Sequence, residues 1–278
     1  MDDPNLAILY WAPMWLLGVI FLISLLLATE CGHRMAACSR VRQDSQAGAH
    51  LGTVLAAVMG LLSLLLAFTY SFAATRADNR KQAVIAEANA IGTAYLRAGL
   101  VPDPTRSRLR VLLRDYADTR LVTGNILSTP SQWQMAIADT ERIQSKLWPT
   151  AVRGMEGRSP TIIDSLLFQA LNAVIDLHTI RLAAGRDRLP EVMPFMLFSI
   201  AVVVMCMMGY STGLAGHRHP VMTTTLAVLY TVVTLVIIDL DRPRTGLVHV
   251  SQQSLIDVRR SMQADAPPAP AMPAPLHP

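Results

Sequence analysis

Four long apolar segments constrain this chain more than any other feature of its sequence. They contain no charged side chain, and they cover residues 6–28, 51–74, 192–214 and 221–238. A helix needs roughly 20 apolar residues to cross a bilayer, and the shorter fourth segment still covers about 27 Å at about 1.5 Å per residue. The sequence therefore predicts an all-α, polytopic membrane protein whose four transmembrane helices form two hairpins.

The composition supports this class and argues against others. Hydrophobic residues make up 52% and charged residues only 16% of the chain, against about 25% charge in a soluble domain. The basic residues are spread over the polar middle of the chain without a recognition motif, so nucleic acid is not an expected partner, whereas membrane lipids are. The sequence lacks G-x-S-x-G, H-E-x-x-H and Walker motifs. We therefore expect neither enzymatic activity nor a cofactor.

The region between the hairpins, residues 75–190, is expected to form a helical extramembrane domain. An apolar stripe at Val84, Ala88, Ile91, Tyr95 and Ala98 predicts that the second transmembrane helix continues to Ala98. Further helices are expected at residues 105–124, 131–149 and 160–185. The second of these ranges ends at a proline, and the third begins at the proline of a Ser-Pro pair.

The chain after the fourth span is expected to differ from the rest. Residues 239–263 form a juxtamembrane segment with a short amphipathic helix at 254–262, and residues 247–251 are the one run that alternates like a strand. Beyond that, residues 264–278 consist mostly of Ala and Pro, a composition typical of a disordered tail.

Charged residues close to the membrane ends form a predicted ion-pair network. Charges in surroundings of low dielectric constant are tolerated mainly when they pair, and the arginine fork suits this role. The expected members are Glu87, Asp176, Arg181, Asp239, Asp241, Arg242 and Arg244, with Arg76 and Arg80 nearby.

A cation site is the alternative interpretation of the same carboxylates, with His178 added, because hard cations prefer several carboxylate oxygens. Asp176 and His178 are two residues apart and do not share a helix face. We therefore favour ion pairing, and we expect no metal.

The second apolar segment carries two further patterns. Gly52, Ala56 and Gly60 recur every four residues, which predicts a close helix contact, either within the chain or between subunits. A face of large apolar side chains follows, with basic residues just beyond it. It consists of Leu61, Leu65, Phe68 and Phe72, followed by Arg76 and Arg80. This face either lines a pore that constricts by dewetting, with an anion-attracting mouth, or is an ordinary lipid-facing surface.

Four segments carry a family resemblance. The segments EANAIGTAYLRA, YADTR, ALNAVIDLH and DLDRPRTGLVHVSQ begin at residues 87, 116, 170 and 239. In this order between two hairpins, they resemble the bacterial bestrophin-like family over about residues 52–255. The resemblance implies a four-span membrane protein with a long helical insertion, distantly similar to bestrophin anion channels. Those channels are pentamers with a pore lined by the second span, so a homo-oligomer that passes small anions is implied here.

Three functions remain open from the sequence. The preferred one is an oligomeric anion channel; the others are a membrane-anchored interaction or regulatory protein, and, more remotely, a membrane enzyme. The basic residues of the short segments do not decide the topology, because the hairpin loops and the flanks carry equal numbers. The resemblance and the basic middle favour the inner membrane, with both termini and the helical domain in the cytosol.

Overall fold

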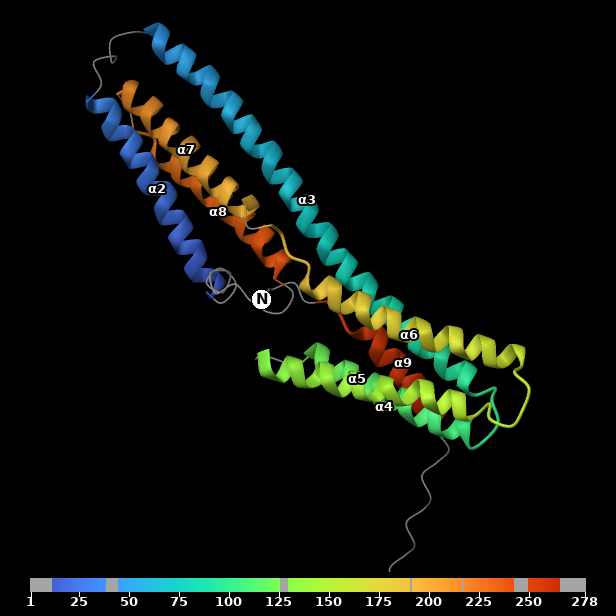
Figure 1. The fold of residues 1–278 in the computed structure, drawn as a ribbon. Helices are drawn as coiled ribbons and strands as arrows, with labels where there is room; N and C mark the ends of the chain where they lie inside the picture. Colours follow the sequence, from blue (N-terminus) through green and yellow to red (C-terminus); the bar gives the residue numbers. More distant parts are fainter. Residues whose placement is uncertain are drawn as a thin grey trace, which may run out of the picture. The chain divides into compact units, whose positions relative to one another are not determined.

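The computed structural model describes residues 12–38, 45–125, 130–190, 192–216, 218–242 and 250–265. These residues form eight α-helices and no strand, which confirms the predicted all-α fold (Figure 1). The chain divides into two compact units. One is built from residues within 1–78 and 187–249, and we call it the membrane unit; the other, from residues within 79–186 and 250–278, is the helical unit.

The membrane unit contains the four helices that are long and apolar enough to cross a membrane. They are α2 (Met14–Cys38), the first part of α3 (Ser45–Ala98), α7 (Val192–Leu214) and α8 (Pro220–Asp241). Helices α2, α7 and α8 contact one another (Figure 1). Helix α2 continues well past the expected end at Ala28. An exposed i, i+4 ion pair between Arg34 Nε and Glu30 Oε1, at 2.9 Å, lies in this added part of the helix.

Small residues let α2 and α7 approach each other closely. A Cβ atom built on Gly32 would overlap the carbonyl oxygen of Cys206, and one on Gly209 would overlap the carbonyl oxygen of Thr29. On Gly213 it would lie 2.9 Å from the carbonyl oxygen of His33. Gly209 and Gly213 therefore form a G-x-x-x-G contact in which the two backbones nearly touch. This pair was not predicted from the sequence.

The turn between α7 and α8 follows from its residue types. Gly216 has a φ angle of +74°, a left-handed conformation that favours glycine and ends α7. Pro220 then occupies the first turn of α8, where its missing N–H would have no helical partner. Together these residues reverse the chain within a few positions and make the second hairpin.

The helical unit contains residues 79–98 of α3 together with four more helices. These are α4 (Thr105–Asn125), α5 (Pro130–Arg153), α6 (Ile162–Arg186) and α9 (Gln253–Ala264). The predicted stripe on α3, which includes Ile91 and Tyr95, is buried in one apolar core with Leu109 and Leu113 of α4 and Leu171 of α6. Helix α3 is continuous from Ser45 to Ala98, which confirms that the second-span helix extends to Ala98.

Helix α5 differs from the prediction because it passes through Pro149 and ends at Arg153. A proline inside a helix removes one backbone hydrogen bond and costs about 3 kcal/mol. Leu147 and Ala151, on either side of Pro149, are both buried in the core of the helical unit. We infer that this burial offsets the cost, so that the helix continues by one turn.

Helix α6 begins two residues later than expected, and a capping box explains its start. Thr161 N–H donates to Asp164 Oδ2 at 2.7 Å, and Asp164 N–H donates back to Thr161 Oγ1 at 3.4 Å. Helix α9 covers the amphipathic helix expected at 254–262. Residues 247–249 of the strand-like run lie outside the described residues, and residues 250 and 251 form no strand; the tail from residue 266 onward also lies outside the described residues.

Candidate functional site

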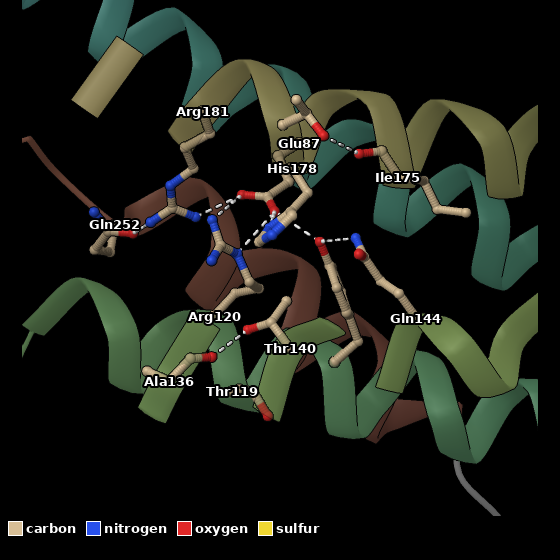
Figure 2. Close-up of polar contacts among 12 residues, drawn as sticks. Glu87, Thr119, Arg120, Ala136, Thr140, Gln144, Ile175, His178, Arg181 and Gln252 are labelled. Carbon is tan, nitrogen blue, oxygen red and sulfur yellow. Dashed lines mark hydrogen bonds and ion pairs between the residues drawn. The ribbon is translucent and has the colours of Figure 1, made fainter. Parts of the chain in front are cut away.

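The most deeply buried polar cluster of the helical unit is centred on the carboxylate of Glu87, which has no solvent-exposed surface. Its Oε1 atom accepts hydrogen bonds from Tyr116 Oη at 2.9 Å and from Arg120 Nε at 2.8 Å. Its Oε2 atom accepts from Arg120 Nη2 at 3.2 Å and from Arg181 Nη1 at 2.6 Å. Figure 2 shows the two guanidinium groups meeting this one carboxylate. We call these residues, with His178, the Glu87 cluster.

Helix periodicity brings the members of the Glu87 cluster together. Tyr116 and Arg120 are one turn apart on α4, and His178 and Arg181 are one turn apart on α6, so each pair shares a face. Glu87 lies on the face of α3 that also carries Val84 and Ile91 into the core, and the three helices therefore direct their polar side chains to one point.

Two amides complete the hydrogen bonding around the Glu87 cluster. Gln252, which immediately precedes α9, accepts from Arg181 Nη2 through its Oε1 atom at 3.0 Å. Gln144 of α5 donates through Nε2 to Tyr116 Oη at 3.3 Å. Burial, followed by the charge of Glu87, raises the pKa of Tyr116 well above its usual range. All five helical elements of this unit thus contribute to the cluster or directly flank it (Figure 2).

His178 stands apart from the other members because its imidazole is buried without a hydrogen bond. Neither ring nitrogen has a hydrogen-bond partner among the described residues, although Nδ1 lies 3.9 Å from Glu87 Oε1. Burial, and then the positive charge of Arg120, lower the pKa of His178 to about 4. The ring is therefore neutral at physiological pH. Arg120 also keeps one atom, Nη1, that is buried and without a hydrogen-bond partner among the described residues.

A second polar cluster lies in the membrane unit at the end of α8. Asp239, Asp241 and Arg242 are all buried there. Asp241 Oδ1 accepts a hydrogen bond from the backbone N–H of Leu189 at 2.9 Å, and Arg242 Nη1 donates to the carbonyl oxygen of Ala12 at 3.0 Å. These bonds fix the segment before α7 and the segment before α2 to the end of α8.

The predicted ion-pair residues do not form one network in the structure, because they belong to two different units. Glu87 and Arg181 belong to the helical unit, whereas Asp239, Asp241 and Arg242 belong to the membrane unit. Asp176 is exposed and forms no ion pair among the described residues, because it lies on the opposite face of α6 from His178. Arg244 lies outside the described residues.

The two arginines beyond the apolar face of α3 are in different surroundings. Arg76 is partly exposed and pairs through Nε with Asp187 Oδ2 at 3.1 Å within the membrane unit. Arg80 is buried. Part of the charge of Arg76 is thus offset by a neighbouring carboxylate, which the sequence did not predict.

The apolar face of α3 in the membrane unit is turned outward from this chain. Leu61, Phe68 and Phe72 are 51%, 55% and 51% exposed, while Leu62 and Leu66, on the opposite face, are buried in the apolar core of the unit. Leu65 lies at the border, half-buried against that core. Leu64, at 52% exposure, joins the outward face in its place.

The small-residue stripe of α3 has no neighbour among the residues that the structure describes. Gly52, Ala56 and Gly60 are exposed, and a Cβ atom added to either glycine would meet nothing within 4 Å. Of the two contacts considered from the sequence, packing within the chain is therefore not found. A contact between subunits stays a prediction.

Sequence reasoning missed Tyr116 and Arg120 as site residues. The signal was present, because Leu109, Leu113, Tyr116 and Arg120 follow one inward face of α4. The four segments quoted for the family resemblance each supply a residue at the Glu87 cluster: Glu87 from the first, Tyr116 and Arg120 from the second, His178 from the third and Gln252 from the fourth.

Comparison with known proteins is consistent with this convergence. A family model described as a bestrophin-like domain matches residues 25–255. This chain belongs to the bestrophin-like family. No curated protein matches the chain.

Solved structures support the bestrophin-like fold. A bacterial bestrophin homologue from Klebsiella pneumoniae is 14% identical, with a TM-score of 0.63 over 88% of this chain and 99% of that chain. A point mutant of that homologue is also 14% identical, with a TM-score of 0.62 over 88% of this chain and 98% of that chain. A variant described only as a membrane protein is 14% identical, with a TM-score of 0.62 over 88% of this chain and 97% of that chain. At such low identity these likenesses establish the fold alone.

Proposed function

We propose that this bestrophin-like protein assembles into a homo-oligomeric pore that conducts small anions across the bacterial inner membrane. The observation that carries the proposal is the two-sided character of α3. One face, with Leu62 and Leu66, is buried within the membrane unit, and the other presents Leu61, Phe68 and Phe72 to the outside of a single chain. In a ring of subunits, the outward face becomes the lining of a central pore.

The large apolar side chains on this face suit a constriction. A ring of Leu and Phe side chains excludes water at its narrowest level, so ions pass only when the ring widens or when they are poorly hydrated. Leu61, Leu65, Phe68 and Phe72 are the proposed lining residues, and the exposure of Leu64 adds this residue to them. Arg76 and Arg80 are proposed for the mouth, where positive charge favours anions. The pairing of Arg76 with Asp187 makes its contribution smaller than that of a free arginine.

The exposed small residues of α3 support assembly. Gly52, Ala56 and Gly60 leave the backbone accessible to a helix of another subunit, and none of the described helices packs against these glycines. Native mass measurement in detergent tests this step. We expect a ring of several copies, five if the assembly follows bestrophins. The substitution Ala56→Leu should dissociate this ring. A monomer or dimer in the unaltered protein would contradict the pore and favour an anchor.

A membrane-anchored interaction protein is the second function considered, and one observation favours it. Leu96 of α3, Leu100 just after the end of α3 and Ile162 of α6 are exposed apolar side chains in the helical unit. These helix ends lie side by side, because Arg97 Nη1 donates to the carbonyl oxygen of Leu166 at 2.7 Å. Such a surface could bind a partner helix. The flux of chloride through purified protein in liposomes separates the two functions, since only a pore conducts.

A further inference from the structure

The Glu87 cluster carries more positive than negative charge. Arg120 and Arg181 both contact Glu87, and among the described residues no other carboxylate forms an ion pair with either arginine. Arginine stays protonated in proteins, and His178 is neutral, so the cluster has an excess of one positive charge. An uncompensated charge shielded from water is costly, and buried charges are normally paired.

The cluster also contains buried nitrogen atoms that are available for further hydrogen bonds. Arg120 Nη1 and both nitrogens of His178 are buried and have no hydrogen-bond partner among the described residues. Arg120 lies close enough to His178 for its charge to act on the imidazole, and both side chains border the same carboxylate (Figure 2). Arg120 Nη1 offers only N–H donors, and the neutral imidazole offers one N–H donor and one acceptor nitrogen. A ligand that is held by N–H groups of both side chains accepts their hydrogen bonds.

We propose that a single monovalent anion of halide size binds between Arg120 Nη1 and an N–H of His178, inside the helical unit. The charge of the ion balances the excess charge of the two arginines, and the two donors satisfy its coordination as charge-assisted and neutral hydrogen bonds. A water molecule would satisfy the same donors but would leave the charge unbalanced. The site is separate from the proposed pore lining, since all of its residues belong to the helical unit.

Crystals of the full-length protein grown in bromide test the proposal on the unaltered chain. We expect an anomalous difference peak between Arg120 and His178, which identifies a halide and distinguishes it from water. Density at this position without an anomalous signal, or no density at all, would overturn the proposal. Neither result depends on whether the protein conducts ions.

A solution measurement adds a test with variants. The melting temperature of the unaltered protein should rise with the logarithm of the chloride concentration. In this series chloride and gluconate are exchanged for each other, so that the ionic strength stays constant. In His178→Leu the apparent chloride affinity should fall by about tenfold or more, because one of the two donors is lost. Asp176→Asn is the matched control, since this exposed charge lies on the same helix. A chloride response that is unchanged in His178→Leu would contradict the site; if that variant does not fold, the bromide crystals decide.

Discussion

Glu87 and Arg120 are 33 residues apart in the sequence, yet they form a two-point ion pair from which water is almost entirely excluded. The pair joins α3 to α4, and Arg181 joins the same carboxylate to α6. Three helices of the helical unit are thus fixed to each other by one side chain. Because buried ion pairs barely repay their desolvation, this arrangement is better understood as setting the helix register than as a large gain in stability.

Removing the charge of Glu87 should therefore be strongly destabilising, although the pair itself adds little. Glu87→Gln leaves two buried arginines without the carboxylate that pairs with both, and we expect a loss of about 3–5 kcal/mol of stability. Thermal unfolding of the purified protein in detergent measures this loss. Asp139→Asn is the control, because it removes a carboxylate from an exposed ion pair with Arg142 in the same unit. Equal melting temperatures for the two variants would show that the Glu87 cluster does not hold the helices together.

The stability of the helical unit should fall in mild acid because of His178. The groups facing its imidazole are Glu87 of α3, Arg120 and Tyr116 of α4, and Arg181 on its own helix. The folded pKa of about 4 lies below the ordinary value of 6.5, so the unfolded chain binds the proton more readily. The stability contributed by the neutral ring is complete above pH 6.5 and is lost as the pH falls toward 4, by about 3 kcal/mol.

A pH series of melting temperatures checks the role of His178. In His178→Gln the side chain does not titrate, so the decline between pH 6.5 and about 4.5 should become much shallower. Asp164, whose pKa the Arg158 side chain holds below its usual range, loses its contribution only at lower pH. An unaltered decline in His178→Gln would mean that another group controls the acid response.

The close contact between α2 and α7 predicts a contrast among glycines. Gly209→Ala places a methyl group where the backbone of Thr29 lies, and such overpacking costs about 1–3 kcal/mol or more when the backbone must move. Gly185→Ala adds the same methyl group near the end of α6, where nothing lies within 4 Å. Thermal unfolding should therefore show a lower melting temperature for Gly209→Ala only. A comparable loss in both variants would indicate that both glycines are packed in the assembled protein.

The membrane helices were predictable because a bilayer imposes a length and an absence of charge that short sequence windows reveal. Helix ends were less predictable. Helix α5 passes Pro149 because the buried side chains of Leu147 and Ala151 compensate for a lost hydrogen bond, and such compensation depends on neighbours that are distant in the sequence. The glycine contact was missed for the same reason, since the spacing of Gly209 and Gly213 acquires meaning only opposite Gly32.

The site was only partly predictable. Glu87 and Arg181 were expected to find partners, but the partners could not be chosen from the sequence, because many arginines lie near membrane ends. Arg120 has the periodicity of a core residue and the chemistry of a surface residue, and only the fold shows that it meets Glu87. Asp176 was expected in the ion-pair network because of its place along the chain, but it lies on an exposed face of α6, where its carboxylate needs no partner and no ion pair forms among the described residues.

The orientation of the helical unit gives a further prediction. Ala138 is exposed on α5, so a single cysteine introduced as Ala138→Cys is accessible on whichever side of the membrane this unit lies. Cys31, Cys38 and Cys206 must first be replaced, because the first two are exposed themselves. We expect no modification by a membrane-impermeant reagent in intact cells and full modification after lysis. Labelling in intact cells would place the helical unit outside the cytosol.

Chloride flux through purified protein in liposomes tests the proposed pore most directly. The unaltered protein should pass chloride above the background of empty liposomes, and Phe68→Ala with Phe72→Ala should increase this flux because a dewetting ring is widened. Phe195→Ala, which removes an exposed ring from α7, should leave the flux unchanged. Background permeability in both the unaltered protein and the double variant, with the protein folded and oligomeric, would contradict the pore and leave the membrane-anchored interaction protein as the better account.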